Sequence, residues 1–517
     1  MHHPGGPFSI PAIKNYVPEP LKPWLIILFA ILFQFAGGGV YLATLTEMKS
    51  GRSLLQEDIL MAGYAGLIGT ALTFTIMLRL KLRFLSKHIL MICSSVLILC
   101  NIICLYTNNV MLLIAVCFIA GIFRMWATFE CNSTIQLWIT PKRDLSIFFC
   151  YVYLLVQGSI LLSGSAFTYV ALLSTWENVH LYVIACLLLL IIIVWVTFNS
   201  NRFMKPFPLF GIDWLGMLMW GLAMLCINFV CIYGAHYDWF DAWQIQFASL
   251  LAIVLIGLNL VRASFIRHPF IPLQTFKYRI VILTFVVYLL VDFLISPAHL
   301  LEEIYFHQIL NYDHHQLIKN NVIGLIGIVL GVLFSHQYFA LRKNSYKSTF
   351  MIGLLAIISY LALMYFWIDQ NTNQQLLQFA ILLRNFGYVI IAIVLLSSLT
   401  KVPFPHFFQS LTVQAVVSAA CGSAIVGAVL HHLFDHSTTR NYQVISAGID
   451  NLEKEKLMQS ASSILESIQN QVLLRSFKEL YGWILLLAIG IFIFLIFYRY
   501  PYITAKGFGI KSLGKRG

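Results

Sequence analysis

The chain has 517 residues, of which 60% are hydrophobic and only 10% are charged. Because a soluble domain carries about 25% charged residues, this composition excludes a soluble globular protein and indicates an integral membrane protein. The formal net charge of +12 does not indicate nucleic-acid binding, because the basic residues lie in short loops between apolar segments, where they report orientation. We therefore expect the lipid bilayer, and no nucleic acid, around this chain.

The first residues and the cysteines narrow the class further. Residues 1–23 are polar and rich in proline, unlike the apolar core and small-residue cleavage site of a signal peptide, so we expect no cleaved leader. All ten cysteines lie in or beside apolar segments and lack metal-ligand spacing. We interpret them as small core residues and expect neither a metal nor a cofactor.

Apolar runs long enough to cross a bilayer recur along the whole chain and predict an all-α polytopic protein. The expected spans are 24–44, 59–80, 88–106, 110–131, 147–171, 180–198, 213–234, 244–262, 280–299, 318–341, 349–368, 376–398, 410–432 and 480–498.

The basic residues between these spans predict their orientation. If the N-terminus is cytoplasmic, about 23 basic residues fall in cytoplasmic segments and about eight outside, which is the bias that membrane proteins show. An extra or missing span would disturb this alternation. We therefore expect a plasma (inner) membrane protein with both termini in the cytoplasm.

Two arginines lie well inside apolar spans, in equivalent places of the two halves. Arg124 is in the fourth span and Arg384 is in the twelfth, and in both cases the following span is rich in small residues. A guanidinium group inside a membrane costs a few kcal/mol, so it faces a protein interior or a wet cavity and is usually functional. The duplication indicates two parallel repeats with a site between them.

The remaining connections suggest a division into three parts. We expect an N-terminal six-helix bundle over 1–198, a linker with two accessory spans over 199–262, and a C-terminal six-helix bundle over 263–517. The longest polar segment, 434–478, has helical spacing in its second part. It is interpreted as a helical hairpin packed on the outer face, or as a docking element for a partner such as a periplasmic adaptor protein.

Several short motifs occur in an order and at positions that point to a known family. They are Met61, Ala62, Gly63 and Tyr64 in the second span, Arg124 in the fourth, the glycine-rich segment 158–164 in the fifth, Trp176 followed by Tyr182, Asp213 and Trp214 at the start of the seventh, and 384–387 followed by Lys401, Val402 and Pro403. With these motifs, the chain resembles the fourteen-span drug:proton antiporter branch (multidrug efflux type) of the major facilitator superfamily.

The resemblance implies a fold and an activity. It implies two six-helix bundles plus two accessory helices, and proton-coupled export of small amphipathic compounds or drugs by alternating access. Two departures concern proton coupling. The loop 78–87 keeps only the cations of the family's motif, and the first span, which reads FQFAGGG over 33–39, lacks the branch's acidic residue.

Proton coupling needs groups inside the spans whose protonation changes as the cavity switches sides. A carboxylate in a low dielectric can hold a proton near neutral pH, and a nearby arginine favours its release. The candidates are Asp292, Glu130, Arg124 and Arg384. The alternatives are structural: Arg124 bonded to carbonyls or hydroxyls, Glu130 wetted near the cytoplasmic mouth, and Arg384 fixing its helix.

Polar and aromatic side chains within spans are candidates for the substrate cavity. They are Gln34, Phe35, Trp126 and Gln157, with Tyr64 implied by the resemblance. The alternatives are hydrogen bonds between helices for the glutamines and ordinary packing for the aromatic side chains. In the first cytoplasmic loop, Arg79, Arg83 and Lys87 are expected to contact anionic headgroups, or the opposite half as a gate.

Three functions remain after these observations. We expect a proton-coupled exporter, with a facilitator or importer without proton antiport as the main alternative. A polytopic membrane glycosyltransferase using Glu302, Glu303 or Asp313 is less favoured, because it does not explain the duplicated arginines. No nucleotide-binding segment is visible, so we expect protons and a small molecule, not ATP, to take part.

Overall fold

The computed structural model describes residues 13–14, 16–36, 48, 54–199, 208–449 and 461–498. Within these ranges the chain is helical and contains no strand beyond an isolated bridge between Ile13 and Phe198. The helices are α1 (Leu21–Phe35), α4 (Gln56–Thr73), α5 (Met77–Arg83), α6 (Ser86–Tyr106), α7 (Val110–Ile139), α8 (Leu145–Leu173), α9 (Trp176–Thr197), α10 (Trp214–Tyr233), α11 (Trp243–Phe265), α12 (Arg279–Ile295), α13 (Pro297–Ile304), α14 (His314–Phe334), α15 (Tyr346–Trp367), α16 (Gln374–Leu399), α17 (Phe404–Ala415), α18 (Gly422–Ile449) and α19 (Ala461–Phe497).

Short irregular segments join some of these helices. Two are 3₁₀ turns, η1 (Trp239–Asp241) and η2 (Leu273–Lys277). Three are π-helical, η3 (Tyr305–Ile309), η4 (Ser335–Leu341) and η5 (Val416–Ala420). A π turn widens a helix by one residue and often marks a functional place.

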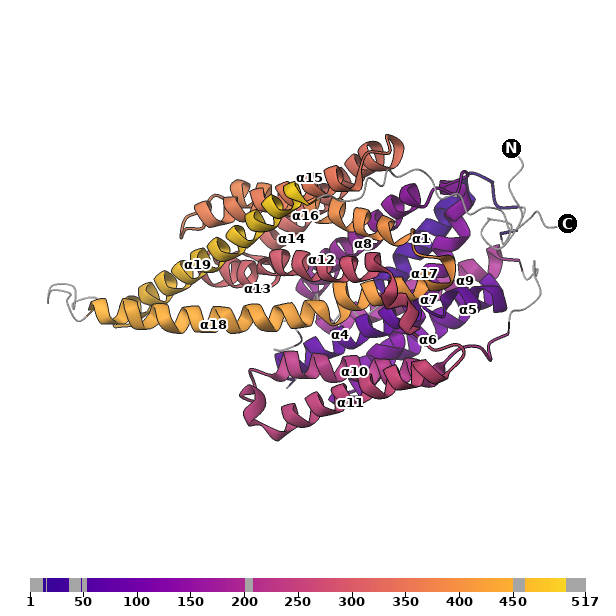
Figure 1. Ribbon diagram of the computed structural model, residues 1–517, viewed down its shortest axis with the longest axis horizontal. Helices are drawn as coiled ribbons and strands as arrows, with labels where there is room; N and C mark the ends of the chain where they lie inside the picture. Colours follow the sequence, from indigo (N-terminus) through magenta and orange to yellow (C-terminus); the bar gives the residue numbers. More distant parts are fainter. Residues whose placement is uncertain are drawn as a thin grey trace.

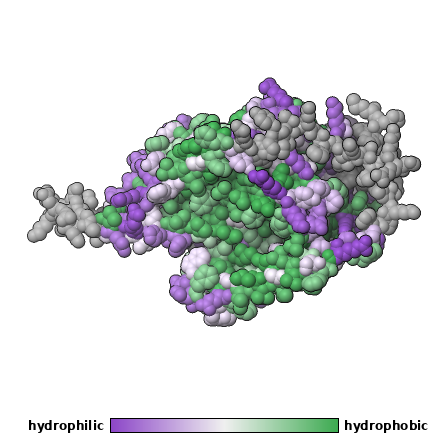
Figure 2. Space-filling view, viewed as in Figure 1, coloured by the Kyte–Doolittle hydropathy of each residue, from purple (hydrophilic) through white to green (hydrophobic). Residues whose placement is uncertain are grey.

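The predicted all-α polytopic fold is confirmed. Twelve helical runs in the described chain are long and apolar enough to cross a membrane, and a thirteenth is the pair α4–α5, which bends by 67°. The first expected span is described only over α1, because 37–47 lies outside the described residues. On the face drawn in Figure 2, apolar side chains cover the middle of the molecule and hydrophilic side chains gather towards both ends. Helices suit this apolar middle because each satisfies its own backbone hydrogen bonds.

Five of the described helices begin at polar residues of the kind that cap free N–H groups. The side chains of Asn109, Asp144, Asp213, Ser345 and Asn373 accept hydrogen bonds from the first turns of α7, α8, α10, α15 and α16. These caps satisfy amides that the helix itself leaves unpaired. They explain why the spans begin where a short polar loop meets an apolar run.

We call α1 to α9 the N-terminal half and α12 to α19 the C-terminal half. The end of α19 lies beside the starts of α12 and α15, because Arg279 donates to the Tyr498 hydroxyl and Lys347 donates to the carbonyls of Ile496 and Tyr498. We call this the basic end. At the other end, which we call the hairpin end, α18 and α19 extend beyond the other helices (Figure 1).

The two halves share one hydrophobic core at the basic end. That core contains Phe29 and Val194 of the N-terminal half together with Val281, Leu399 and Leu411 of the C-terminal half. A second core, which includes Tyr305, Tyr360 and Phe477, lies within the C-terminal half. The halves are therefore packed together most extensively at the basic end.

Helices α10 and α11, the two spans expected between the halves, pack as a pair along the outside of the bundle (Figure 1). Helix α10 contacts α4 of the N-terminal half and α18 of the C-terminal half. Helix α11 exposes apolar side chains such as Phe247, Leu250 and Ile253, as expected for a surface that faces lipid.

The segment 434–478, expected to be a hairpin or a docking element, consists of the extended ends of α18 and α19 where it is described. Residues 450–460 lie outside the described residues. The two helices are joined by buried polar contacts, because the Asn441 amide donates to Ser476 and to Glu479, and Ser437 also donates to Glu479. The segment is therefore a helical hairpin that continues two spans.

Candidate functional site

Asp292 lies on α12 at the interface between the halves, among tyrosines from several helices. Tyr64 of α4 and Tyr153 of α8 come from the N-terminal half, and Tyr288 of α12 and Tyr388 of α16 come from the C-terminal half. All four lie within electrostatic range of the Asp292 carboxylate. The two halves therefore supply one common polar cluster, which we call the tyrosine site.

Hydrogen bonds hold the tyrosine site together across the interface. The Tyr153 and Tyr288 hydroxyls are 3.2 Å apart, and Gln414 Nε2 donates to the Tyr288 hydroxyl over 2.8 Å. The Tyr288 hydroxyl in turn donates to the carbonyl of Ala392 at 3.2 Å.

Two further polar contacts cross between the halves at the same place. Gln157 of α8 lies within interaction range of Tyr388 of α16, and Ser423 of α18 lies within interaction range of Tyr64 of α4. Tyr64, Gln157 and Asp292, three of the residues predicted from the sequence, are thus brought together.

The acid of this site has no counter-charge in the described chain. The buried Oδ2 oxygen of Asp292 has no hydrogen-bond partner among the described residues, and no described basic side chain forms an ion pair with it. An unpaired carboxylate is expensive in a low-dielectric interior. A proton or a cation bound beside Asp292 would remove this cost.

Arg384 lies one helical turn from Tyr388, further towards the hairpin end, and is ion-paired. Its guanidinium donates to Glu302 of α13, whose other carboxylate oxygen accepts a 2.6 Å hydrogen bond from Tyr360. Tyr360 is also 3.5 Å from the Tyr481 hydroxyl. This cluster ties α13, α15, α16 and α19 together within the C-terminal half.

Arg124 is buried and donates to the Thr70 hydroxyl over 2.9 Å. Thr70 in turn donates to the carbonyls of Gly66 and Gly121, so the group links α4 to α7. Neither Arg124 nor Arg384 is directed to lipid. The hydroxyl partner of Arg124 is the kind that its structural alternative expected, and the described residues give it no acidic partner.

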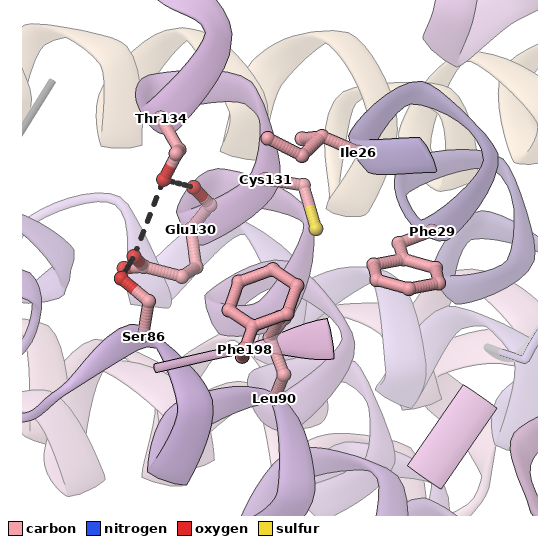
Figure 3. Close-up of a pocket in the computed structure, with 8 residues that line it drawn as sticks. All are labelled: Ile26, Phe29, Ser86, Leu90, Glu130, Cys131, Thr134 and Phe198. Carbon is pink, nitrogen blue, oxygen red and sulfur yellow. Dashed lines mark hydrogen bonds between the residues drawn. The ribbon is translucent and has the colours of Figure 1, made fainter. Parts of the chain in front are cut away.

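Glu130 lies near the basic end, inside the N-terminal half and away from the tyrosine site. Its carboxylate accepts hydrogen bonds from Lys81 at 2.9 Å and from Ser86 at 2.6 Å, and both partners of the ion pair are buried. Figure 3 shows Glu130 with Ser86 and Thr134 on one side of a small cavity and the apolar side chains of Phe29 and Phe198 on the other. The cavity has a volume of about 10 Å³, which is enough for about one water molecule.

The other predicted cavity residues pack within the N-terminal half. Gln34 donates to the Thr128 hydroxyl over 3.5 Å. The Phe35 ring meets Phe167 edge to face. The Trp126 ring contacts Phe84 and Phe123. The structure does not bring these three residues to the tyrosine site.

The predicted gate loop joins parts of the N-terminal half to the linker. Lys87 donates to the carbonyl of Trp195 at the end of α9, Arg79 lies against Gly211 before α10, and Arg83 is half-buried. Contact with the C-terminal half comes instead from the bend before α5, where the Thr75 and Thr412 hydroxyls are 2.6 Å apart.

Two further contacts close the basic end between the halves. Phe129 of α7 meets Phe408 of α17 edge to face, with ring centroids 6.2 Å apart. Asp144, the N-cap of α8, forms an ion pair with Lys343 in the loop before α15. The structure is therefore the state of this protein in which the basic end is closed.

Two charged groups in the loops of the basic end have shifted pKa values. Burial lowers the pKa of Lys401 to about 8, and its ammonium lies 3.9 Å from the ring centroid of Tyr346. Burial alone would raise the pKa of Asp213, but hydrogen bonds from Arg262 and from the amides of Gly216 and Phe270 bring that pKa below its ordinary value. Asp213 thus ties the start of α10 to the end of α11.

Sequence reasoning did not include Tyr153, Tyr288, Tyr388, Gln414 or Ser423 among the candidate site residues. One signal could have found three of them. Tyr153, Tyr288 and Tyr388 lie four residues from Gln157, Asp292 and Arg384, respectively, so each shares a helical face with a polar residue already under consideration.

Comparison with known proteins supplies the fold's name. No family model matches the chain, and no curated protein matches its sequence. Among solved structures, a peptide transporter POT in complex with sulfate matches with a TM-score of 0.57 and 15% identity, covering 95% of this chain and 98% of that one. The nucleoside transporter NupG matches at 0.50 and 14%, covering 92% and 99%.

The proton:xylose symporter XylE, which is described as a member of the major facilitator superfamily, matches at 0.50 and 11%, covering 90% of this chain and 95% of that one. This chain has the major facilitator fold. At such identities the likeness concerns the fold alone. In this fold the tyrosine site occupies the interface of the two halves, which is where repeat-built transporters bind their substrates.

Proposed function

We propose that the protein is a proton-coupled secondary transporter that exports small amphipathic compounds, including drugs, by alternating access. The observation that carries this proposal is Asp292, an unpaired carboxylate at the interface, surrounded by tyrosines from both halves. The major facilitator fold supports it, because in this fold the two halves rock about a central site.

The chemistry of the tyrosine site favours a cationic amphipathic substrate. Tyrosine rings attract organic cations through their faces, and a carboxylate without a counter-ion gains most from a positive partner. A proton and a substrate cation would therefore compete for Asp292. Such competition couples the two movements, since each can bind only when the other has left.

The closed basic end defines the movement that a transport cycle needs. Substrate arriving at the basic end requires separation of Thr75 from Thr412 and of Phe129 from Phe408, and loss of the ion pair between Asp144 and Lys343. If this end faces the cytoplasm of a cell with an inner membrane, as the basic loops predict, the described state is the one that faces outwards or is occluded.

The test is substrate-driven proton flux in proteoliposomes that contain a pH-sensitive dye, with tetraphenylphosphonium and ethidium as probe cations. We expect Asp292→Asn to lower proton flux at least tenfold, because an amide cannot carry the proton. Glu177→Gln, at an exposed position in the first turn of α9, is the matched control and should match the unmodified protein. Unchanged proton flux in Asp292→Asn would overturn the assignment.

A facilitator or importer without proton antiport is the second candidate. It is favoured by the structural matches, which include a proton:xylose symporter and a nucleoside transporter. The same vesicles separate the two functions. In an antiporter, protons that flow down an imposed gradient drive the substrate the other way, against its own gradient. A facilitator only equalises the substrate concentration on the two sides.

We also propose that the hairpin of α18 and α19 can dock a periplasmic adaptor. It extends past the other helices (Figure 1) and exposes Tyr442, Val444 and Leu465. Replacing Tyr442 and Val444 together by aspartate should reduce efflux from cells and leave transport in vesicles unchanged. An equal loss in both assays would show that the hairpin acts within the transporter itself.

A further inference from the structure

Helix α10 is fastened to both halves by buried polar groups. At its hairpin end, the Tyr233 hydroxyl donates to Asp58 in the first turn of α4. Five residues before Tyr233, Asn228 is fully buried, and its Nδ2 donates over 2.9 Å to the carbonyl of Ala420 in the C-terminal half. Figure 1 shows α10 alongside α4 on the side of the bundle that α18 also borders.

Ala420 is the last residue of the π segment η5, which interrupts the helix formed by α17 and α18. The widened turn is closed by a hydrogen bond from the Cys421 amide to the carbonyl of Val416, five residues earlier. At the next position, a side chain on Gly422 would collide with the main chain of Val417. The wide turn is therefore built into the sequence at this place.

The wide turn changes which way the following residues face. Gln414 and Ser423 are nine positions apart, so in an uninterrupted α-helix their side chains would point about 180° apart. One extra residue in a π turn makes the flanking helix behave as if it were one residue shorter, which reduces that angle to about 80°. Gln414 can then reach Tyr288 of α12 while Ser423 reaches Tyr64 of α4.

Helix α10 packs directly on the wide turn. The Cys421 thiol lies 3.8 Å from the carbonyl of Met224, one turn before Asn228. An amide donor in an otherwise apolar contact is costly to bury without its partner, so the bond from Asn228 favours one register of η5. The described chain offers no second hydrogen bond to Asn228, since its Oδ1 is unpaired there.

We propose that Asn228 is a positioning residue of the tyrosine site. Through the carbonyl of Ala420 it holds η5 in the register that directs Gln414 and Ser423 to the site tyrosines. Helix α10, which belongs to neither half, then helps to set the geometry of the tyrosine site. The effect on substrate rests on the proposed function, whereas the effect on register does not.

The test compares Asn228→Leu, which keeps the branching and number of side-chain heavy atoms but removes the donor, with Asn228→Gln, which keeps an amide. The matched control is Asn259→Leu on α11, because Asn259 is also buried but its Nδ2 has no partner among the described residues. Two quantities are measured on purified protein. One is amide hydrogen exchange by mass spectrometry, and the other is the Kd for tetraphenylphosphonium.

We expect Asn228→Leu to speed exchange at least threefold in peptides that cover η5 and in those that carry Tyr64 and Tyr288. We expect it to raise the Kd at least threefold. Asn228→Gln should fall between this variant and the unmodified protein, and Asn259→Leu should change neither quantity. If Asn228→Leu does not fold, Asn228→Ala carries the same comparison.

The two proposals fail in different ways. If the unmodified protein does not bind tetraphenylphosphonium, the proposed function is contradicted, and exchange alone then decides the role of Asn228. Faster exchange confined to η5, with the tyrosine-bearing peptides and the Kd unchanged, overturns the positioning role. Equal effects of Asn228→Leu and Asn259→Leu overturn it as well, because they would show only loss of packing.

Discussion

At the scale of single residues, three acids among the described parts of the bundle, Glu130, Glu302 and Asp292, differ in whether a cation is paired with them. Glu130 is paired with Lys81, and Glu302 is paired with Arg384, but Asp292 has no cation among the residues described. Paired acids are held in place by their partners, whereas an unpaired one is free to exchange a proton or a ligand. This difference in pairing is the basis of our proposal that Asp292, and not Glu130 or Glu302, carries the coupling proton.

The pair of Lys81 and Glu130 permits a test of that distinction. Removing one partner of a buried ion pair leaves an uncompensated charge and costs about 3–5 kcal/mol, whereas an apolar pair of similar size is tolerated. We expect Glu130→Gln to lower the Tm of the purified protein clearly, and the double variant Lys81→Met with Glu130→Met to recover most of the loss. This double variant should still move protons. If its proton flux is lost, Glu130 takes part in proton coupling.

At the scale of elements, the contact of α4 with α7 depends on glycines. A side chain on Gly69 or Gly121 would collide with the main chain of the facing helix, and small residues at such crossings let membrane helices pack closely. The same helices carry Tyr64 and Arg124, so this crossing sets the position of both residues. The spacing of the two helices is therefore set by backbone contact and not by interdigitated side chains.

We expect Gly121→Ala to destabilise the protein by about 1–3 kcal/mol, the usual cost of overpacking a tight contact. Gly164→Ala on α8 is the control, because a side chain there meets no atom within 4 Å. The measurement is thermal unfolding in detergent, in which the fraction of protein that stays monodisperse is recorded as the temperature rises. Equal Tm values for the two variants would show that α4 and α7 can separate without cost.

At the scale of the whole molecule, contacts between the two halves set how much of the protein has a closed basic end and how much has an open one. The ion pair of Asp144 with Lys343 joins them across their interface. Asp144→Asn removes the charge but keeps an N-cap for α8, because asparagine caps helices as well as aspartate does. A weaker contact shifts the population towards the state with an open basic end.

We expect Asp144→Asn to increase maleimide labelling of Cys150, which is buried near this ion pair, at least threefold, as measured by mass spectrometry of the labelled peptide. Lys343→Met should have the same effect, since it breaks the same pair. Glu177→Gln on α9 does not touch the pair and should leave labelling unchanged. Slower labelling in the first two variants would mean that the ion pair opposes closure.

The sequence alone determined the membrane class, the helical fold and the approximate limits of the spans. These features depend on local hydrophobicity and on capping residues such as Asn109 and Asp144, which act over a few neighbouring positions. Two charged residues inside spans, Arg124 and Arg384, were also visible as unusual because their cost in lipid does not depend on the fold.

Only the tertiary structure decided which of these groups meet. Tyr64, Tyr153, Tyr288 and Tyr388 are distant in the chain, and their convergence on Asp292 depends on the packing of α4, α8, α12 and α16, which hydropathy does not encode. The partner of Glu130 likewise depends on the bend between α4 and α5, which brings Lys81 back onto α7. A side chain's partners are set by the three-dimensional path of every neighbouring helix, and local sequence carries little of that information.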